Sequence, residues 1–275
     1  MDIYNRISVV MSVYKNDKVS FFKEAVESLL EQTYQPSEII IVVDGYVNEG
    51  IDNLLEDLSN NFLIKIIRLS QNSGLANALN IGVKKAQYPL IARMDSDDIC
   101  FKDRFEKQVE YLNKENLDIV GGQIIEFGID TQDVISERKV PVKHQEMVRF
   151  MKLRSPFSHP TIIFKKEVFT SLEGYDTVIF PEDYDFFVRA YLKGFQFGNV
   201  NQNILWFRLG DDRINTIKRR WGKSYARNEY KLYKNFLKLG FYNYFYFFKA
   251  VVLKVPLRVL PFIVYKFIYF NILRR

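Results

Sequence analysis

Residues 89–98 read PLIARMDSDD, a short apolar run that ends in three aspartates within four residues. Such a run, closed abruptly by acidic side chains, is typical of a buried strand. Runs of the same kind occur earlier in the chain, at residues 7–13, 38–43 and 63–69. The segments between them have apolar residues at helical spacing, and these are residues 21–32, 51–58 and 75–86. Strands that alternate with helices in this way predict an α/β fold with right-handed βαβ units and a mostly parallel sheet flanked by helices.

The pattern continues beyond residue 100 in a less regular form. Apolar spacing predicts helices at residues 105–113 and 183–192, and strands at residues 119–127 and 204–209. We expect residues 156–160 to form a loop and the chain to be helical from Asn215 onward.

Polar residues follow the predicted strands at their carboxyl ends. Ser12 and Tyr14 come at the end of the first strand, Asp44 after the second, and Asp95 directly after the strand predicted at residues 89–94. Ligands of open parallel sheets bind beyond these ends. Periodicity alone therefore predicts a ligand site at this edge of the sheet.

The composition fits a globular protein with a full core. Of 275 residues, 48% are hydrophobic, 13 are glycine and only Cys100 is cysteine. These values exclude a collagen, a disordered chain and a disulfide framework. A lone cysteine fits a reducing compartment, and we expect Cys100 to be a small buried side chain.

The net charge of +6 is divided unevenly along the chain. Residues 213–275 contain 15 Lys and Arg against one acid, Glu229, which gives +14, whereas the first 212 residues carry 24 bases and 32 acids, which gives −8. Twelve of the last 35 residues are Phe or Tyr. This division predicts an α/β domain at residues 1–212 and a helical, basic and aromatic extension at residues 213–275 that meets an anionic surface.

The extension is interrupted too often by charge to cross a bilayer. Its longest uncharged run, residues 239–248, has ten residues, and a spanning helix needs about 20. Four cations follow at intervals that suit interfacial helices: Lys249, Lys254, Arg258 and Lys266. Pro256 and Pro261 exclude one continuous helix. We expect a peripheral protein on the inner, cytoplasmic face of the membrane, with anionic lipid as its partner; the alternative is that the aromatic side packs on the α/β domain or on a second subunit.

Asp95, Asp97 and Asp98 form the strongest local signal. Three neighbouring carboxylates repel one another, so their burial is costly without a cation. Mg²⁺ and Mn²⁺ take one or two protein carboxylates and complete their shell with phosphate oxygens and water. Asp is also a favoured helix cap. A divalent metal site and a capped helix start both fit these residues.

Three weaker signals lie elsewhere in the chain. Residues 181–183 (PED) open a predicted helix, so their carboxylates suit a general base with a supporting acid, or an acidic first turn. Residues 70–76 (SQNSGLA) place Gly74 at a helix start, where free N–H groups attract anions, although an ordinary turn explains them as well. We interpret His159, in a loop between prolines, as structural.

Other classes lack their motifs. The sequence has no G-x-G-x-x-G, no G-x-x-x-x-G-K-[ST] and no G-x-S-x-G, which excludes a dinucleotide fold, a P-loop and a nucleophile elbow. It also has no zinc-ligand spacing. A nucleotidyltransferase, which uses a metal-binding aspartate pair, remains an alternative. A membrane- or nucleic-acid-binding protein acting through residues 218–227 is another, although the surrounding sequence is too apolar for a solvated nucleic-acid face.

In their order, five short motifs resemble those of the family 2 glycosyltransferases, inverting enzymes with the nucleotide-sugar-binding GT-A fold. The motifs are SVVMSVYKN at 8–16, VDG at 43–45, NSGLA at 72–76, DSDD at 95–98 and PED at 181–183. FSHPT at 157–161 makes the chain most similar to bacterial transferases that build capsule, exopolysaccharide or O-antigen (lipopolysaccharide) units. The resemblance covers residues 6–212.

The resemblance implies roles for individual residues. The implied nucleotide-sugar pocket comprises Ser12, Tyr14, Asp44, Asn72, Gly74, Asp95 and Arg208. Within it, Asp44 would accept from the uracil ring N–H and Arg208 would lie by the diphosphate. Asp97 would hold Mg²⁺ or Mn²⁺ on the diphosphate. Asp183 would be the catalytic base, and Glu182 would orient the acceptor or the base.

Two motifs depart from the family pattern. Ser12 and Lys15 replace residues of the common Pro-x-Tyr-Asn form, and Asp44-Gly45 replaces an Asp-Asp or Asp-Ser pair. These differences affect selectivity for base and sugar, not the reaction. The implied reaction is inverting, metal-dependent transfer of a hexosyl group from a nucleotide sugar, by expectation a UDP-sugar, to a lipid-linked or oligosaccharide acceptor. No nucleic-acid partner is expected.

Overall fold

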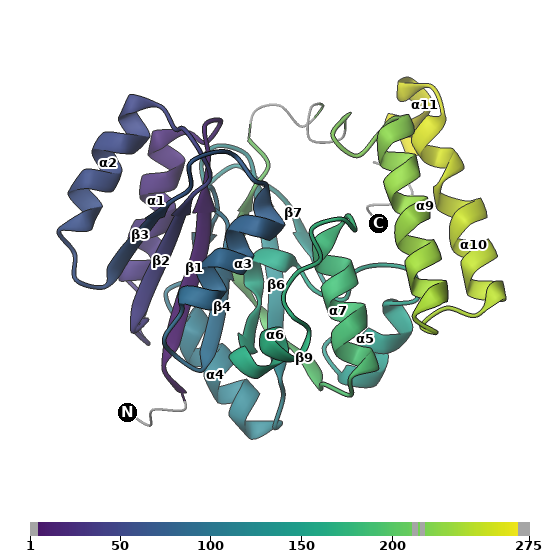
Figure 1. Cartoon of the computed structure of the whole chain (residues 1–275), viewed down its shortest axis with the longest axis horizontal. Helices are drawn as coiled ribbons and strands as arrows, with labels where there is room; N and C mark the ends of the chain where they lie inside the picture. The colour runs from purple at the N-terminus through teal and green to yellow at the C-terminus, as the bar shows by residue number, and fades with distance from the viewer. Residues whose placement is uncertain (1–4, 211–213, 215–217, 269–275) are drawn as a thin grey trace.

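The computed structural model describes residues 5–210, 214 and 218–268, which form one sheet covered by helices (Figure 1). The strands are β1 (Ile7–Val13), β2 (Glu38–Val43), β3 (Ile64–Arg68), β4 (Leu90–Met94), β5 (Ile99–Cys100), β6 (Ile119–Phe127), β7 (Val134–Arg138), β8 (Ile163–Lys165) and β9 (Phe197–Arg208).

The α-helices of the described residues are α1 (Val19–Leu30), α2 (Glu49–Ser59), α3 (Leu75–Lys85), α4 (Arg104–Lys114), α5 (His144–Phe150), α6 (Lys166–Ser171), α7 (Glu182–Leu192), α9 (Lys223–Lys238), α10 (Tyr244–Lys254) and α11 (Phe262–Ile268). Two short 3-10 helices, η2 (His159–Thr161) and η3 (Pro256–Val259), complete them. The predicted helix from Asn215 begins outside the described residues, and α9 is its described continuation.

The register of the parallel strands brings their carboxyl ends to one edge. The strand order is β3-β2-β1-β4-β8-β6-β9-β5, with β7 beside β6. Across β3, β2, β1 and β4 all pairs are parallel. Val13 pairs with Val43 on β2, and Met11 pairs with Met94 on β4. The loops that follow these three strands therefore start side by side, as the sequence predicts.

The second half of the sheet is mixed, a detail that the prediction of a mostly parallel sheet did not specify. β8 runs antiparallel to β4 and β6, and β5 runs antiparallel to β9, while β6 and β9 are parallel. β5 and β8 have two and three residues, too few to show a period of two. β9 extends over 12 residues, whereas the sequence predicted a strand only at residues 204–209, because the first half of β9 is largely polar.

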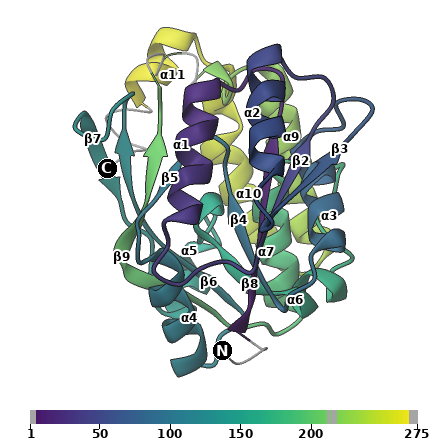
Figure 2. The same cartoon turned by 90° about the vertical axis from the view of Figure 1, so that its left-hand side faces the viewer.

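Two apolar layers hold helices on the two faces of the sheet. Side chains alternate along a strand, so Ile39 and Ile41 of β2 point to the layer under α1, α2 and α4, and Ile40 and Val42 to the layer under α3, α6 and α7. Figure 2 shows α1 and α2 side by side on their face. A strand buried on both faces explains the unbroken EIIIVV sequence of β2.

The C-terminal helices pack beside α7, at the right of Figure 1. Leu232, Phe236 and Tyr242 belong to the same buried layer as Phe186 of α7, and the rings of Phe236 and Tyr184 lie 5.0 Å apart. The boundary drawn from composition near residue 212 lies outside the described residues, and the division into two parts remains a prediction. The described part of the extension nevertheless shares a core with the α/β layers.

Two of the four cations assigned to lipid face inward, which corrects that expectation. Arg258 forms a two-pronged ion pair with the buried Glu229, with Nε–Oε2 at 2.9 Å and Nη2–Oε1 at 3.1 Å. Lys254 donates to the carbonyl of Leu153, and its pKa is lowered to about 8, chiefly by burial. The breaks predicted at Pro256 and Pro261 are confirmed, because the chain ends α10, forms η3 and restarts as α11 around them.

Candidate active site

Three carboxylates converge on the loop that follows β4. One oxygen from each of Asp95, Asp97 and Asp98 lies within 4.8 Å of the others. Asp98 is fully buried, and its Oδ1 accepts the backbone N–H of Arg208 at 2.9 Å. Its Oδ2 is a buried oxygen without a hydrogen-bond partner among the described residues.

Asp17, which the sequence analysis missed, adds a fourth carboxylate to this group. It lies in the loop after β1, where its Oδ2 accepts the backbone N–H of Tyr14 at 3.0 Å and the hydroxyl of Ser96 at 2.8 Å. Burial raises its pKa to about 6, and the charge of Asp95 adds to this. The available signal was its position four residues after Val13, the last residue of a strand that carries a predicted site residue.

The acidic group has the chemistry of a divalent-cation site. Burial first, then the charges of Asp95 and Asp17, raise the pKa of Asp97 to about 7. Burial and the same kind of repulsion raise the pKa of Asp98 well above its usual range. Hard oxygen ligands, mutual repulsion and an unpaired buried oxygen fit Mg²⁺ or Mn²⁺. Of the two interpretations of DSDD, the metal site fits this geometry, since α4 starts later, at Arg104.

Arg93 lies between this group and a second acidic pair. Its side chain is buried, and its Nη2 is 2.5 Å from Asp95 Oδ1. Its Nε and Nη1 have no hydrogen-bond partner in the described structure. The charge of Arg93 also lowers the pKa values of Glu182 and Asp183 against the effect of burial. The charge of one guanidinium thus acts on both acidic motifs, although Asp95 and Glu182 are 87 residues apart in the sequence.

Glu182 and Asp183 form the first turn of α7. Burial and then the charge of Asp183 raise the pKa of Glu182 to about 7, and Asp95 contributes in the same direction. Burial also raises the pKa of Asp183, whereas the backbone N–H of Tyr184 and the charge of Arg93 oppose the rise. A buried carboxylate with a raised pKa is suited to accept a proton near neutral pH.

His159 lies close to this pair through Tyr175. Its Nε2 is 3.1 Å from the Tyr175 hydroxyl, and the two rings meet edge to face. Burial, then the charge of Arg93, hold the pKa of His159 well below its usual range, so the imidazole is neutral. His159 is therefore a hydrogen-bonded wall of the site, consistent with the structural interpretation; Tyr175 was not predicted.

The carboxylate of Asp44 accepts hydrogen bonds from the loop before α3. Its Oδ1 accepts from the backbone N–H and the hydroxyl of Ser73, at 2.7 and 3.0 Å, and its Oδ2 from Asn72 Nδ2 and the Gly74 N–H, at 3.0 and 2.9 Å. A carboxylate has about four acceptor sites, and all four are used. Gly45 permits this, because a Cβ there would lie 2.5 Å from the backbone N of Asn72. Asp44 thus fixes the loop, and its predicted contact with the uracil N–H stays a prediction.

Arg208 is also held by contacts within the protein. Its guanidinium is buried between the rings of Phe21 and Phe127, at 4.0 and 4.5 Å. Its Nε donates to the carbonyl of Asp97 at 2.7 Å, and its terminal nitrogens contact Glu24 and the Ile129 carbonyl. All three nitrogens are engaged within the protein. Arg208 therefore supports the Asp97 loop, and its place by the diphosphate stays a prediction.

Ser12 remains a candidate lining residue. It is half-buried near the end of β1, beside Val42 of β2. Tyr14 follows at the same edge and contributes its backbone N–H to Asp17. Of the predicted site residues, the structure thus brings Asp95, Asp97, Glu182 and Asp183 together around Arg93.

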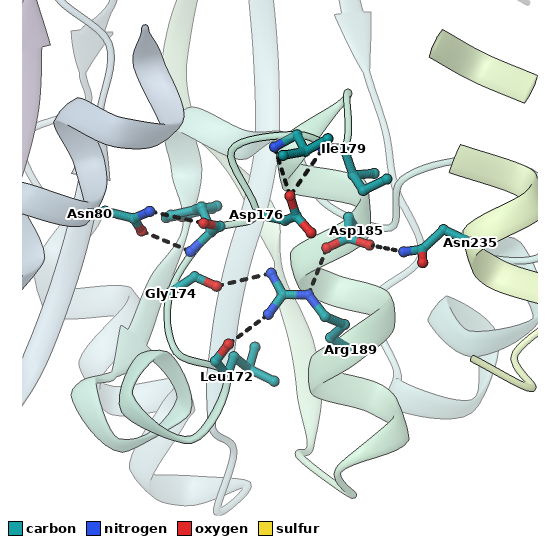
Figure 3. A network of polar contacts seen from close by, with 10 residues as sticks. Asn80, Leu172, Gly174, Asp176, Ile179, Asp185, Arg189 and Asn235 are labelled. Atoms are coloured by element: carbon teal, nitrogen blue, oxygen red, sulfur yellow. Dashed lines mark hydrogen bonds and ion pairs between the residues drawn. The ribbon is translucent and has the colours of Figure 1, made fainter. Parts of the chain in front are cut away.

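A polar network holds α7 in place between α3 and α9 (Figure 3). Asp185, fully buried, accepts from Arg189 Nε at 2.6 Å and from Asn235 Nδ2 of α9 at 2.8 Å. Arg189 also donates to the carbonyls of Leu172 and Gly174, at 2.8 and 2.9 Å. Asn80 of α3 pairs with the backbone of Tyr175 in both directions at 2.8 Å. The helix that carries Glu182 and Asp183 is therefore fixed from both sides.

Comparison with known proteins identifies the family. The family model described as glycosyl transferase family 2 matches residues 8–172, more than half of the chain. The chain belongs to glycosyl transferase family 2. The resemblance found in the sequence is confirmed, and the nucleotidyltransferase and nucleic-acid alternatives are no longer needed.

Two curated relatives span nearly the whole of this family 2 glycosyltransferase. One, from Haemophilus influenzae, is an uncharacterized glycosyltransferase with 34% identity over 98% of this chain and all of its own length. Another, from Escherichia coli, is a UDP-Gal:α-D-GlcNAc-diphosphoundecaprenol β-1,3-galactosyltransferase, with 31% identity over 98% of this chain and 97% of its own.

A solved structure supports the predicted GT-A architecture. The mannosyltransferase PcManGT from Pyrobaculum calidifontis, in complex with GDP-Man and Mn²⁺, has a TM-score of 0.66 and 14% identity. The match covers 97% of this chain and 75% of PcManGT. At this identity the likeness concerns the fold alone. The expected GT-A α/β fold with helices after it is thereby confirmed.

Proposed function

We propose that this glycosyltransferase moves a hexosyl group, with inversion, from a UDP-sugar to a saccharide carried on a lipid diphosphate during synthesis of a bacterial surface polysaccharide. The full-length relative from Escherichia coli, named for UDP-Gal and a GlcNAc-diphosphoundecaprenol acceptor, supports both substrate classes. An acceptor of that kind is embedded in a membrane, so we place the enzyme on the cytoplasmic membrane surface.

The meeting of two acidic groups around Arg93 carries the proposal. Asp95 and its neighbours form one group, Glu182 and Asp183 form the other, and the charge of Arg93 acts on both. Donor activation and acceptor deprotonation must occur on either side of one anomeric carbon. A site in which both groups share one arginine supports this arrangement.

On the donor side, Asp97 would hold Mg²⁺ or Mn²⁺, together with Asp95 or Asp98. The bound cation would neutralise the charge that develops on the departing nucleoside diphosphate. Arg208 positions this loop by holding the Asp97 carbonyl. Asp95, held by Arg93, is placed beside the sugar, and Ser12 and Tyr14 line the nucleotide pocket.

The loop at residues 72–74 forms the other wall of the nucleotide pocket. We assign Asp44 to holding this loop, because Asn72, Ser73 and Gly74 use its acceptor sites. Gly74, with φ at 86°, starts α3 in a conformation that other residues adopt only with strain. Asn72 and Gly74 thus shape the pocket with Asp44 as their anchor.

On the acceptor side, Asp183 would take the proton of the attacking hydroxyl. Burial raises the pKa of Asp183, which makes it a stronger base than an ordinary carboxylate, and the charge of Arg93 opposes part of this rise. The acceptor oxygen then attacks the face opposite the diphosphate, and one displacement inverts the anomeric carbon. Glu182, with a pKa of about 7, would orient the acceptor by a hydrogen bond.

Asp183→Asn tests the assignment of the base. The amide keeps the size of the side chain but cannot accept the proton, so transfer should fall by at least about 10²-fold while Mn²⁺-dependent UDP binding is kept. UDP release in the presence of acceptor measures turnover, and calorimetry measures binding. Asp176→Asn, an acid in the loop before α7, is the control and should transfer sugar normally. Turnover like the wild type in Asp183→Asn would end the assignment.

A further inference from the structure

The outer sides of α10 and α11 carry an exposed apolar stripe. Phe245, Phe248 and Val252 of α10 are 67%, 60% and 66% exposed, and Ile263 and Phe267 of α11 are 82% and 64% exposed. Spacings of three, four and seven residues place each set on one helical face. We call these five residues the apolar stripe. The opposite side of α10 is fixed inward, where Ala250 is buried in the core.

The charges around the stripe are of one sign. Glu229 is the single acid between residues 213 and 275, and it is buried and paired with Arg258. The inward-facing Lys254 and Arg258 form hydrogen bonds within the protein and do not belong to this surface. Lys249 is exposed on α10 and Lys266 lies on α11. The surface that surrounds the stripe offers cations and no carboxylate among residues 218–268.

The helices that bear the stripe are too short to cross a bilayer. Within the described parts of the chain, no helix is long and apolar enough to do so. α10 and α11 have 11 and seven residues and are separated by η3. An apolar face with a cationic border on short helices is the pattern of a segment that lies in the lipid headgroup region.

We propose that the apolar stripe docks this enzyme on an anionic lipid bilayer. Phe245, Phe248 and their neighbours enter the boundary between headgroups and acyl chains, and Lys249 and Lys266 meet the lipid phosphates. The docking itself does not depend on the proposed function. Its role, which is to bring the enzyme to a lipid-linked acceptor, rests on that function.

A chain of ring and hydrogen-bond contacts connects the segments next to the apolar stripe with the start of α7, which carries the proposed base. Phe180, three residues before Asp183, packs its ring 5.8 Å from that of Tyr225 in α9, and the Arg258 guanidinium lies 4.7 Å from the same ring. The backbone N–H of Gly222 donates to the carbonyl of Arg258 at 2.8 Å. Lipid contact at α10 and α11 would therefore fix the orientation of the active site over the membrane.

The double variant Phe245→Ser, Phe248→Ser tests the docking directly. Co-sedimentation with vesicles of phosphatidylcholine and phosphatidylglycerol should show strong binding of the wild type, weaker binding at high salt, and little binding to pure phosphatidylcholine. Each phenylalanine lost should weaken partitioning by about tenfold or more. Phe62→Ser, at an isolated side chain that is 91% exposed, is the matched control and should bind like the wild type.

Mn²⁺-dependent UDP binding, measured in solution on the same variants, separates this inference from the proposed function. The double variant should keep UDP binding while it loses vesicle binding. A wild type that binds UDP but not the anionic vesicles would overturn the docking and leave the proposed function standing. A wild type that is dimeric in sedimentation, with the double variant monomeric, would show that a second copy covers the stripe and would overturn it as well.

Discussion

Replacing Asn235 by alanine should impair the reaction from a position outside the active site. Asn235 lies on α9, and its Nδ2 donates to Asp185 Oδ1 at 2.8 Å (Figure 3). Asp185 is two residues from the proposed base and fully buried. The variant leaves one oxygen of this carboxylate without a donor, while the other keeps Arg189.

The expected loss of stability follows from the charge of the Asp185 carboxylate, which accepts the hydrogen bond. A hydrogen bond to a charged group contributes about 1.5–3 kcal/mol, and an unsatisfied buried oxygen retains its desolvation cost. For a protein of this size the melting temperature should fall by roughly 3–12 °C. Loosening the first turn of α7 displaces Asp183, and a misplacement on the order of 1 Å lowers kcat by up to about 10²-fold. Mn²⁺-dependent UDP binding should not change.

Tyr233→Phe provides the matched control in the same helix. It removes a hydroxyl that donates to Glu229, a residue of the same helix, at 2.9 Å, so it should lower stability without removing the hydrogen bond that reaches Asp185 of α7. Thermal unfolding and steady-state kinetics on both variants decide the question. Equal kcat values in the two variants at equal loss of stability would refute a positioning role for Asn235.

Two other predictions concern the rest of the fold. Glu38 is buried and accepts from Ser8 and Lys65, each at 2.6 Å. Burial opposes the ionisation of Glu38, but these bonds lower its pKa below the ordinary 4.5. The carboxylate therefore stabilises the fold above pH 4.5, and this stabilisation is lost as the pH falls through the pKa of the folded state. Glu38→Gln should therefore be less stable than the wild type at neutral pH, by about 1.5–3 kcal/mol, with the gap closing in acid; a gap independent of pH in urea unfolding would contradict this. Arg208→Met should weaken Mn²⁺-dependent UDP binding by about tenfold, and Arg208→Lys should not restore it, because the planar fork is needed; unchanged affinity in calorimetry would remove Arg208 from the support of Asp97.

The sequence was sufficient where buried strands and chain order determine position. β1, β2 and β6 have the predicted bounds, because long apolar runs between polar ends leave little choice of register. The parallel order of the first four strands then places Asp44 and Asp95 at one edge. That much of the site follows from topology.

Contacts between distant segments could not be predicted. Arg208 donates a hydrogen bond to the carbonyl of Asp97, more than a hundred residues away in the sequence. The carboxylate oxygens of Asp44 accept hydrogen bonds from the loop at residues 72–74. Nothing in the local sequence shows that Arg258 will pair with Glu229 rather than face lipid. Asp17 and Arg93 belong to the site because of the conformation of the loops and the orientation of their side chains. Hydrophobic periodicity predicts neither.

The anomeric configuration of the first product is the most direct test of a single displacement between the Asp97 group and Asp183. Proton NMR of the sugar transferred from an α-linked UDP-sugar reports it through the coupling of the anomeric hydrogen. A β-linked product, absent with Asp183→Asn, is the predicted result. An α-linked product would contradict the account, because it requires either two displacements or a reaction on the face that the diphosphate leaves.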